Sequence, residues 1–468
     1  MIDQNKGSLE EQFFKFFDDN EETLEAYYIL KYTNHPVFLT GKAGTGKSTF
    51  IKLIQHISQS LCLITAPTGI AARNIDGITI HSRFHIPFGF QIPDDQLIES
   101  IRFNEIDRTE IEASDLLIID EISMLSSSTL DIVNLVLQKV CNNSFPFGGK
   151  KVLMVGDPFQ LPPITNSSDF DVLQNHYDSE YFFDADIFKA VNPIRIELKR
   201  VYRQNDEKFL NILNGIRSRL KVFEHLQILN RTCKNSITSR TTKQNSIILT
   251  FTNRLADEIN NDELNKLTGD SFNYKATVWG HFNWQGILAE KELELKIGAR
   301  VMFTKNHPKS EYVNGSMGIV AELSKDEIIV QLDDGEKISV EKEIWTNNQY
   351  EKSIKSGDRR LSIKEKGGMS QYPLKLAWAI TVHKSQGLTF DDVYLLNEGS
   401  AFAIGQLYVA LSRCRSIQGL KIYKPLQVTD VKTDCRILKF YYSIHEENRK
   451  DILLHKIADQ LEALDRIA

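Results

Sequence analysis

The chain has 468 residues, of which 41% are hydrophobic and 25% are charged. These proportions are ordinary for a globular protein, and the length corresponds to about three domains. With 25 glycines and 12 prolines the chain is neither collagen-like nor of low complexity, and no apolar run approaches the ~18 residues of a membrane span. The N-terminal segment lacks the basic start and apolar core of a secretion signal.

The cysteines indicate the redox environment of the protein, and the charge bears on whether it binds nucleic acid. Its five cysteines are scattered without a CxxC pair, which argues against a disulfide framework or a zinc site and predicts a reducing, cytoplasmic environment. The net charge of −6 lacks the basic balance typical of DNA-binding proteins. Residues 351–384 nevertheless carry eight Lys or Arg against three acids. They form either a solvated loop or part of a local nucleic-acid surface.

Residues 36–197 alternate short apolar runs with helical patterns, including helices expected over 48–59 and 129–141. This alternation predicts the α/β class, with a parallel sheet covered by helices on both faces. A second series of this kind begins at residue 195 and resumes over 375–423. Between its parts, residues 293–368 contain short β-rich runs and turns, which predict an inserted β-barrel. A smaller insertion is expected over 86–112, and a helix over 447–466 in the C-terminal tail.

The segment from Gly41 to Ser48 matches the pattern GxxxxGK[ST] between a strand and a helix, the context that a P-loop requires. Glycines let backbone N–H groups wrap phosphates, and the helix N-terminus adds its dipole. Lys47 is expected to reach the β- and γ-phosphates, and the Ser48 hydroxyl to ligate Mg²⁺. The predicted cofactors are therefore ATP and Mg²⁺, and the predicted nucleotide-binding residues of the loop are Gly41, Ala43, Gly44, Thr45, Gly46, Lys47, Ser48 and Thr49.

Two later segments are candidates for the rest of this site. An apolar strand over 116–119 leads to Asp120, expected to hold the metal, and Glu121, expected to act on the attacking water. The segment GDPFQLPP follows a third strand, and the amide of its Gln160 can bond both a γ-phosphate and a water. A rigid surface turn is the alternative for this segment. Arg203 and Arg413 could stabilise the charge of a transition state, although each could also be a surface charge.

The order of the motifs resembles superfamily 1 DNA helicases, specifically the branch with the petite-integration-frequency (PIF) helicases, bacterial RecD and phage Dda. The motifs are GKAGTGKS, APTGIAARNI, IIDEISM, GDPFQLPP, VYRQ, AITVHKSQGLTF and LYVALSRCRS. The resemblance covers about residues 36–425. It implies two RecA-like P-loop domains with ATP between them, a wedge insertion in the first and an SH3-like β-barrel in the second.

The resemblance also sets the expected domain limits and activity. Residues 1–196 would be the first RecA-like domain with the wedge over 86–112, residues 197–292 and 369–430 the second, 293–368 the SH3-like domain and 431–468 a partly helical tail. The implied protein is a monomeric cytoplasmic helicase of bacterial or phage type, which moves 5′ to 3′ on single-stranded DNA and opens DNA forks. G-quadruplex DNA and RNA–DNA hybrids are further candidate substrates.

The resemblance carries DNA-binding roles onto matching positions, because a sequence-tolerant motor needs phosphate contacts and stacking. The implied DNA-binding residues are Pro67, Thr68, Gly69, His81, Phe88, His383, Lys384 and Ser385, and the implied additional nucleotide contacts are Gln386 and Gly387. A core histidine at 81, a Phe88 packed within its insertion and a solvated Lys384 are the structural alternatives. Leu24 stands where family members often carry an adenine-reading glutamine.

Two other functions share much of this pattern. An ATPase that translocates and strips proteins from DNA, with little unwinding, would carry every motif. A non-catalytic DNA-binding subunit would keep the fold, but the intact Lys47, Asp120 and Glu121 argue against it.

Overall fold

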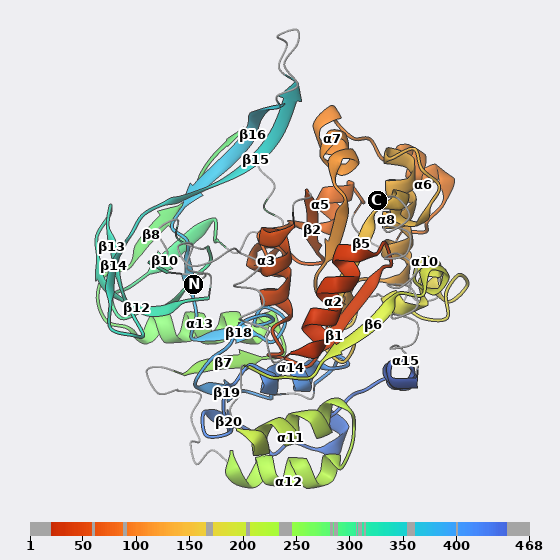
Figure 1. The fold of residues 1–468 in the computed structure, drawn as a ribbon. Coiled ribbons are helices and arrows are strands. Elements are labelled where there is room, and N and C mark those ends of the chain that lie inside the picture. The colour runs from red at the N-terminus through yellow and green to blue at the C-terminus, as the bar shows by residue number, and fades with distance from the viewer. Residues whose placement is uncertain are drawn as a thin grey trace. The chain divides into compact units, whose positions relative to one another are not determined.

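The computed structural model describes residues 20–58, 61–87, 91–164, 172–202, 206–233, 246–280, 284, 289–305, 307, 311–312, 315–352, 361–398 and 401–446. The chain divides into two compact units (Figure 1). Unit 1 comprises residues 1–205, 403–405 and 433–468, and unit 2 comprises residues 206–402 and 406–432. Both units therefore contain segments that are distant in sequence.

Unit 1 is built on a six-stranded, fully parallel sheet with the order β3-β2-β4-β5-β1-β6. Its strands are β1 (Val37–Gly41), β2 (Cys62–Ala66), β3 (Ile78–Thr79), β4 (Leu116–Ile119), β5 (Lys151–Gly156) and β6 (Ile194–Leu198). β1 and β4 are buried along their whole lengths, as expected for a parallel sheet covered on both faces. The carboxyl ends of all six strands lie at one edge, where ligands bind in folds of this kind.

The helices of unit 1 follow strong local signals. Asn20, Thr79, Asp94, Asn104 and Ser126 each accept a hydrogen bond from a backbone N–H in the first turn of a helix. The helices are α2 (Glu21–Tyr32), α3 (Lys47–Ile57), α4 (Gly69–Asn74), α5 (Ile80–Phe84), α6 (Asp95–Ser100), α7 (Glu105–Ala113), α8 (Ser127–Val140), α10 (Asp186–Val191) and α15 (Cys435–Glu446), with 3₁₀ turns η1 (Ile122–Met124), η2 (Pro146–Gly149) and η3 (Phe182–Asp184). Apolar side chains of α2 and α3 pack with those of β1 in one core cluster.

Unit 2 contains a smaller parallel sheet with the order β18-β7-β19-β20. Its strands are β7 (Ile247–Thr250), β18 (Ala379–Thr381), β19 (Val393–Leu395) and β20 (Leu420–Ile422), and the helices of the unit are α11 (Glu207–Arg217), α12 (Val222–Thr232), α13 (Asn253–Lys266), α14 (Gln406–Ser412) and the 3₁₀ turn η4 (Val428–Asp430). The Asn260 side chain of α13 bonds both the carbonyl and the amide of Ala379, each at 2.9 Å, and so fixes this helix against β18. The predicted α/β class with two parallel sheets is confirmed.

Antiparallel sheets form the rest of unit 2. A five-stranded sheet has the order β14-β13-β12-β11-β17, a three-stranded sheet the order β15-β16-β9, and β10 pairs with β8. The strands are β8 (Phe272–Lys275), β9 (Thr277–Gly280), β10 (Glu292–Leu295), β11 (Arg300–Phe303), β12 (Met317–Leu323), β13 (Ile328–Leu332), β14 (Lys337–Val340), β15 (Glu343–Lys352), β16 (Leu361–Gln371) and β17 (Leu374–Leu376). In Figure 1, β15 and β16 form a long two-stranded ribbon. β11–β14 lie within residues 293–368, where short β-rich runs were predicted, whereas β8 and β9 precede that region and β17 follows it. An SH3-like barrel stays a prediction.

Two predicted helices occur close to their expected limits. α3 and α8 begin and end within two residues of the predicted bounds. The helix predicted over 447–466 lies outside the described residues, and the tail instead shows α15, which ends at Glu446. The expected insertion over 86–112 contains α6 and α7.

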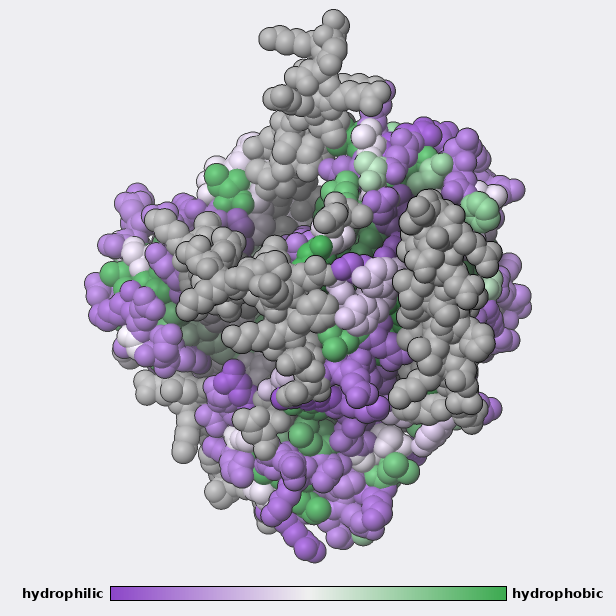
Figure 2. All heavy atoms as spheres, viewed as in Figure 1, coloured by the Kyte–Doolittle hydropathy of each residue, from purple (hydrophilic) through white to green (hydrophobic). Residues whose placement is uncertain are grey.

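Hydrophilic residues predominate among the coloured atoms of the face drawn in Figure 2, with hydrophobic residues in small groups. Across the described part of the chain, no helix combines the length and the apolar character needed to cross a membrane.

Candidate active site

The P-loop joins β1 to α3, and the side chain of Lys47 folds back onto the backbone of this loop. Nζ of Lys47 donates hydrogen bonds to the carbonyl oxygens of Gly41, at 2.7 Å, and Lys42, at 2.9 Å. Gly44 and Gly46 have φ of 81° and 87°, in the left-handed region that favours glycine. No described side chain caps the N-terminus of α3. An uncapped helix start behind a glycine-rich loop is the arrangement that binds phosphate.

Two adjacent carboxylates follow β4, of which Asp120 is buried and Glu121 is half-buried. Asp120 is 4% exposed, and its Oδ1 accepts a hydrogen bond from the Glu121 amide at 2.9 Å. Burial, and then the neighbouring Glu121 charge, raise the pKa of Asp120 to about 7, while Lys47 acts in the opposite direction. Glu121 has φ of 49°, a left-handed conformation that non-glycine residues seldom adopt. Such backbone strain is common at functional sites.

The residues of this site fit a magnesium ion. The Ser48 hydroxyl, exposed on the first turn of α3, and the Asp120 carboxylate are the hard oxygen donors that Mg²⁺ prefers. Burial, and then the neighbouring Glu121 carboxylate, disfavour the charged form of Asp120, so a positive charge beside it would be stabilising. A divalent cation beside Asp120 would provide that charge.

Gln160 lies in a tight turn that begins at the end of β5. The backbone N–H of Gln160 donates to the Asp157 carbonyl at 2.9 Å, and the backbone N–H of Phe159 donates to Oδ1 of Asp157 at 3.2 Å. Gln160 itself is 3% exposed. Because β5 lies between β1 and β4 in the sheet, this turn starts between the P-loop and Asp120. The structure thus brings Lys47, Asp120 and the Gln160 turn to one edge of unit 1.

The DNA-binding candidates of unit 1 lie further along the same edge. Pro67–Gly69 follow β2, and the Thr68 hydroxyl accepts a hydrogen bond from the Ala71 amide at 3.3 Å. β3 pairs with β2 through Ala66 and Thr79 and leads directly into α5, which carries His81. His81 is half-buried, and burial lowers its pKa. The segment that follows β2 and the helix that follows β3 therefore start from two paired strands.

The candidates of unit 2 lie in the turn after β18. His383 is half-buried and stacks on Phe402 at 6.4 Å between ring centroids, and burial lowers its pKa. The buried Ser385 hydroxyl donates to the Val382 carbonyl at 2.7 Å. Gln386 is buried beside it, and Gly387 has φ of 82°.

Arg413 directly follows α14 and contacts the same turn. It is 1% exposed, and its Nε donates to the Val409 carbonyl at 3.0 Å. Its Nη1 lies 3.3 Å from the carbonyl oxygens of both Ser385 and Leu388, on either side of the Gln386-Gly387 pair. Within unit 2, Arg413 therefore lies against the turn that contains residues 383–387. Two other candidates, Phe88 and Arg203, lie outside the described residues.

Comparisons with known proteins identify this chain as similar to helicases. The family model of PIF1-like helicases matches residues 20–227, and that of the UvrD-like helicase C-terminal domain matches residues 376–416. The chain is 36% identical to Pif1 from Bacteroides sp., solved in complex with ADP-AlF4, with a TM-score of 0.80 over 92% of this chain and 97% of that one. It is 30% identical to the ATP-dependent DNA helicase Pif1 of Campylobacter jejuni over 88% of this chain and 95% of that protein. The chain belongs to the Pif1 family of helicases.

Other Pif1 relatives are longer. The chain is 32% identical to the ATP-dependent DNA helicase PIF1 of Rattus norvegicus over 88% of its own length, but it spans only 62% of the rat protein. Pif1 from Bacteroides has also been solved bound to single-stranded DNA, with 37% identity and a TM-score of 0.70 to this chain. The resemblance to PIF helicases seen in the motifs is thus confirmed for the family, and the α/β fold with two parallel sheets is that of the Pif1 structures.

The Pif1 motif VYRQ contains a residue that the sequence reasoning did not single out. The Tyr202 amide donates to the Gly44 carbonyl at 2.8 Å, and its hydroxyl accepts from Nδ2 of Asn20 at 3.4 Å. The Arg200 guanidinium lies 5.2 Å from the centre of its ring. An aromatic ring is therefore held beside the P-loop. By contrast, Leu24 packs partly buried against the core of unit 1 and has no hydrogen-bonding side chain.

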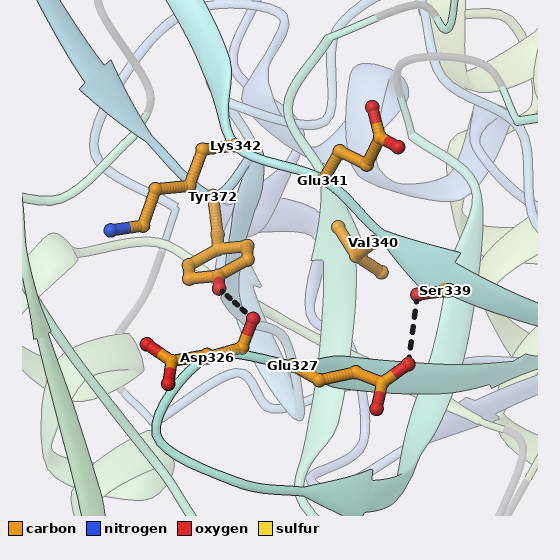
Figure 3. A pocket seen from close by; sticks show the side chains of 7 residues that line it. All are labelled: Asp326, Glu327, Ser339, Val340, Glu341, Lys342 and Tyr372. Atoms are coloured by element: carbon orange, nitrogen blue, oxygen red, sulfur yellow. Dashed lines mark hydrogen bonds between the residues drawn. The ribbon is translucent and has the colours of Figure 1, made fainter.

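A shallow pocket of about 400 Å³ lies beside β14 in unit 2 (Figure 3). Its lining residues are Asp326, Glu327, Ser339, Val340, Glu341, Lys342 and Tyr372. The Tyr372 hydroxyl donates to the Asp326 carbonyl at 3.2 Å, and Nζ of Lys342 lies 5.4 Å from the Tyr372 ring centre. Three carboxylates against one lysine repel phosphate, so we place no nucleic acid in this pocket.

Proposed function

We propose that this chain is an ATP-dependent DNA helicase that moves 5′ to 3′ on single-stranded DNA and unwinds the duplex ahead of it. The observation that carries the proposal is the grouping of Lys47, Asp120 and the Gln160 turn at one edge of a parallel sheet. The names of the relatives support it, because the Campylobacter and rat proteins are ATP-dependent DNA helicases. The direction of movement rests on the resemblance to the 5′-to-3′ branch.

Each residue of the nucleotide site has a chemical task in this proposal. Lys47 places its ammonium against the β- and γ-phosphates, in exchange for the two P-loop carbonyls that it bonds here. Ser48 and Asp120 would hold Mg²⁺, which neutralises charge on the phosphate oxygens when bound. Glu121 orients the attacking water and accepts its proton. Gln160 reports the γ-phosphate, and Arg203 and Arg413 stabilise the charge of the transition state.

The remaining residues would grip the DNA strand. Thr68 and His81 in unit 1, and His383 and Lys384 in unit 2, are suited to phosphate contacts, which are independent of base sequence. Phe88 would act within the wedge over 86–112. We retain the predicted domain limits and the monomeric state, and G-quadruplex DNA and RNA–DNA hybrids remain candidate substrates. Forked DNA is the substrate that best suits the proposal, since one similar structure is described as the basis for DNA unwinding at forked double-stranded DNA by two coordinating Pif1 helicases.

The test combines an ATPase assay with strand displacement. We expect single-stranded DNA to stimulate ATP hydrolysis, and duplexes with a 5′ tail to be opened more readily than those with a 3′ tail. Lys47→Ala should abolish both activities, whereas Lys52→Ala, on the same helix, should retain them.

Each assay can overturn a separate part of the proposal. Hydrolysis that is indifferent to DNA would contradict the motor function. Preference for a 3′ tail would reverse only the direction. DNA-stimulated hydrolysis without strand displacement would instead identify a translocase that remodels protein–DNA complexes.

A further inference from the structure

The C-terminal helix α15 contacts the turn that carries Gln160. The Tyr441 ring meets the Phe159 ring edge-on, with centroids 5.1 Å apart and planes at 76°. The Tyr441 hydroxyl donates to Oε1 of Glu197, on β6, at 3.0 Å. Phe159 immediately precedes Gln160 and is itself buried. A residue from the end of the chain thus packs against the neighbour of the proposed γ-phosphate sensor.

α15 is held firmly on unit 1. The Phe440 ring stacks on Phe183 at 4.3 Å and lies 5.7 Å from Phe38, on the strand that leads into the P-loop. Nη1 of Arg195 donates to the Ser443 hydroxyl at 2.8 Å. Aromatic packing and a hydrogen bond on both sides of Tyr441 fix where its ring lies.

The Gln160 turn is also confined by a second segment of unit 1. A Cβ built on Gly405 would lie 2.4 Å from the Phe159 carbonyl oxygen and 2.5 Å from that of Gln160. Gly405 also has φ of 71°, so glycine is required there for two reasons. Unit 1 includes two segments from the C-terminal part of the chain, residues 403–405 and residues 433–468, which contain α15. Both segments contact this turn. The turn is therefore held by parts of the chain that are distant from it in sequence.

We propose that Tyr441 is a positioning residue for Gln160 and acts through the Phe159 ring. The proposal rests on the proposed function, in which Gln160 must hold its amide in one orientation towards phosphate and water. Catalytic groups need positions fixed to within about 0.5 Å, which side chains packed behind them provide. Removal of the Tyr441 ring leaves space beside Phe159, so the turn can shift while the P-loop and its lysine remain in place. Turnover should fall without a matching loss of ATP binding.

The test is a double-mutant cycle between Tyr441 and Gln160 in the full-length chain. We expect Tyr441→Leu to lower the DNA-stimulated kcat about tenfold while KM for ATP changes less than about twofold. In a Gln160→Ala background, the same change should lower kcat less than about twofold, because the residue that it positions is gone. Tyr441→Phe keeps the ring and should retain kcat within about twofold. Tyr442→Leu, at the exposed neighbouring position, is the matched control.

The outcomes separate the inference from the proposed function. If the wild-type chain shows no DNA-stimulated hydrolysis, the proposed function fails and the inference fails with it. If the wild type is stimulated but Tyr441→Leu equals Tyr442→Leu, the inference alone is wrong. Effects of Tyr441→Leu and Gln160→Ala that multiply would also overturn it, because a general loss of stability does not depend on Gln160. Should Tyr441→Leu fail to fold, Tyr441→Met takes its place in the cycle under the same criteria.

Discussion

The amide of Tyr202 donates a hydrogen bond to the carbonyl of Gly44, and this bond holds the segment after β6 against the P-loop. We predict that the Tyr202 ring, which this bond holds near the loop, stacks on the nucleotide base. This matters because Leu24 cannot read a base by hydrogen bonding.

Replacing Tyr202 by Ala should therefore weaken ATP binding about tenfold, since base–aromatic stacking contributes about 1–3 kcal/mol per base. Because the base would be held by stacking, GTP and ATP should show similar affinities in the wild type. Competition binding with a fluorescent nucleotide measures both. Tyr32→Ala, an exposed tyrosine on α2, is the control. Unchanged affinity in Tyr202→Ala, or strong preference for ATP, would contradict this role.

Glu121→Gln should bind ATP and DNA normally but hydrolyse ATP at least about 10²-fold more slowly, because an amide cannot accept the proton of the attacking water. The amide is nearly the same size as the carboxylate, so the strained turn at Glu121 can persist. Nucleotide binding and single-turnover hydrolysis distinguish the two steps. Loss of ATP binding would show that Glu121 supports the structure of the site rather than its chemistry.

Arg413→Ala should lower turnover by about 10³-fold, by analogy with arginine fingers. Because the guanidinium also bonds carbonyls on both sides of Gln386-Gly387, the variant should melt at a lower temperature as well. Arg415→Ala removes a neighbouring arginine that is 56% exposed, and it should change neither property much. A destabilised Arg413→Ala with wild-type turnover would assign Arg413 a structural role, and Arg203 would then be the finger to test.

Lys384→Ala should remove about one phosphate contact from the DNA interface. Affinity for single-stranded DNA should fall almost equally for all sequences, and the slope of log affinity against log salt should decrease by roughly 0.7 to 1. Binding titrations at several salt concentrations test this, with Lys266→Ala as an exposed lysine control on α13. An unchanged slope together with unchanged DNA stimulation would place the strand elsewhere.

Lys375 should make the stability of unit 2 depend on pH. Burial, and then the nearby Lys384, lower the pKa of Lys375 from 10.5 to about 8, while Glu290 and Asp257 act in the opposite direction. Between about pH 8 and 10.5 the unfolded chain therefore holds a proton that the folded chain has lost, so stability rises with pH. Relative to Lys375→Met, the wild type should gain about 1–3 kcal/mol across this range. Thermal melting of both proteins from pH 7.5 to 10 measures the difference, and parallel curves would exclude the effect.

Local chemistry was readable from the sequence because each motif depends on neighbouring residues. Glycines at 44 and 46, Lys47 and a following helix suffice to predict a phosphate-binding loop, and an apolar run predicts the strand that delivers Asp120. Helices α3 and α8 were predicted within a few residues, since caps and apolar periodicity are local signals.

Only the tertiary structure decided which of these segments meet. The strand order sets the Gln160 turn between the P-loop and Asp120, and no spacing in the sequence gives that order. Three contacts join residues that are far apart in the chain: the bond between Tyr202 and Gly44, the bond between buried Arg413 and Ser385, and the packing of Tyr441 on Phe159. Such contacts form because packing and hydrogen bonding select among many compact arrangements, and a local pattern does not contain that choice.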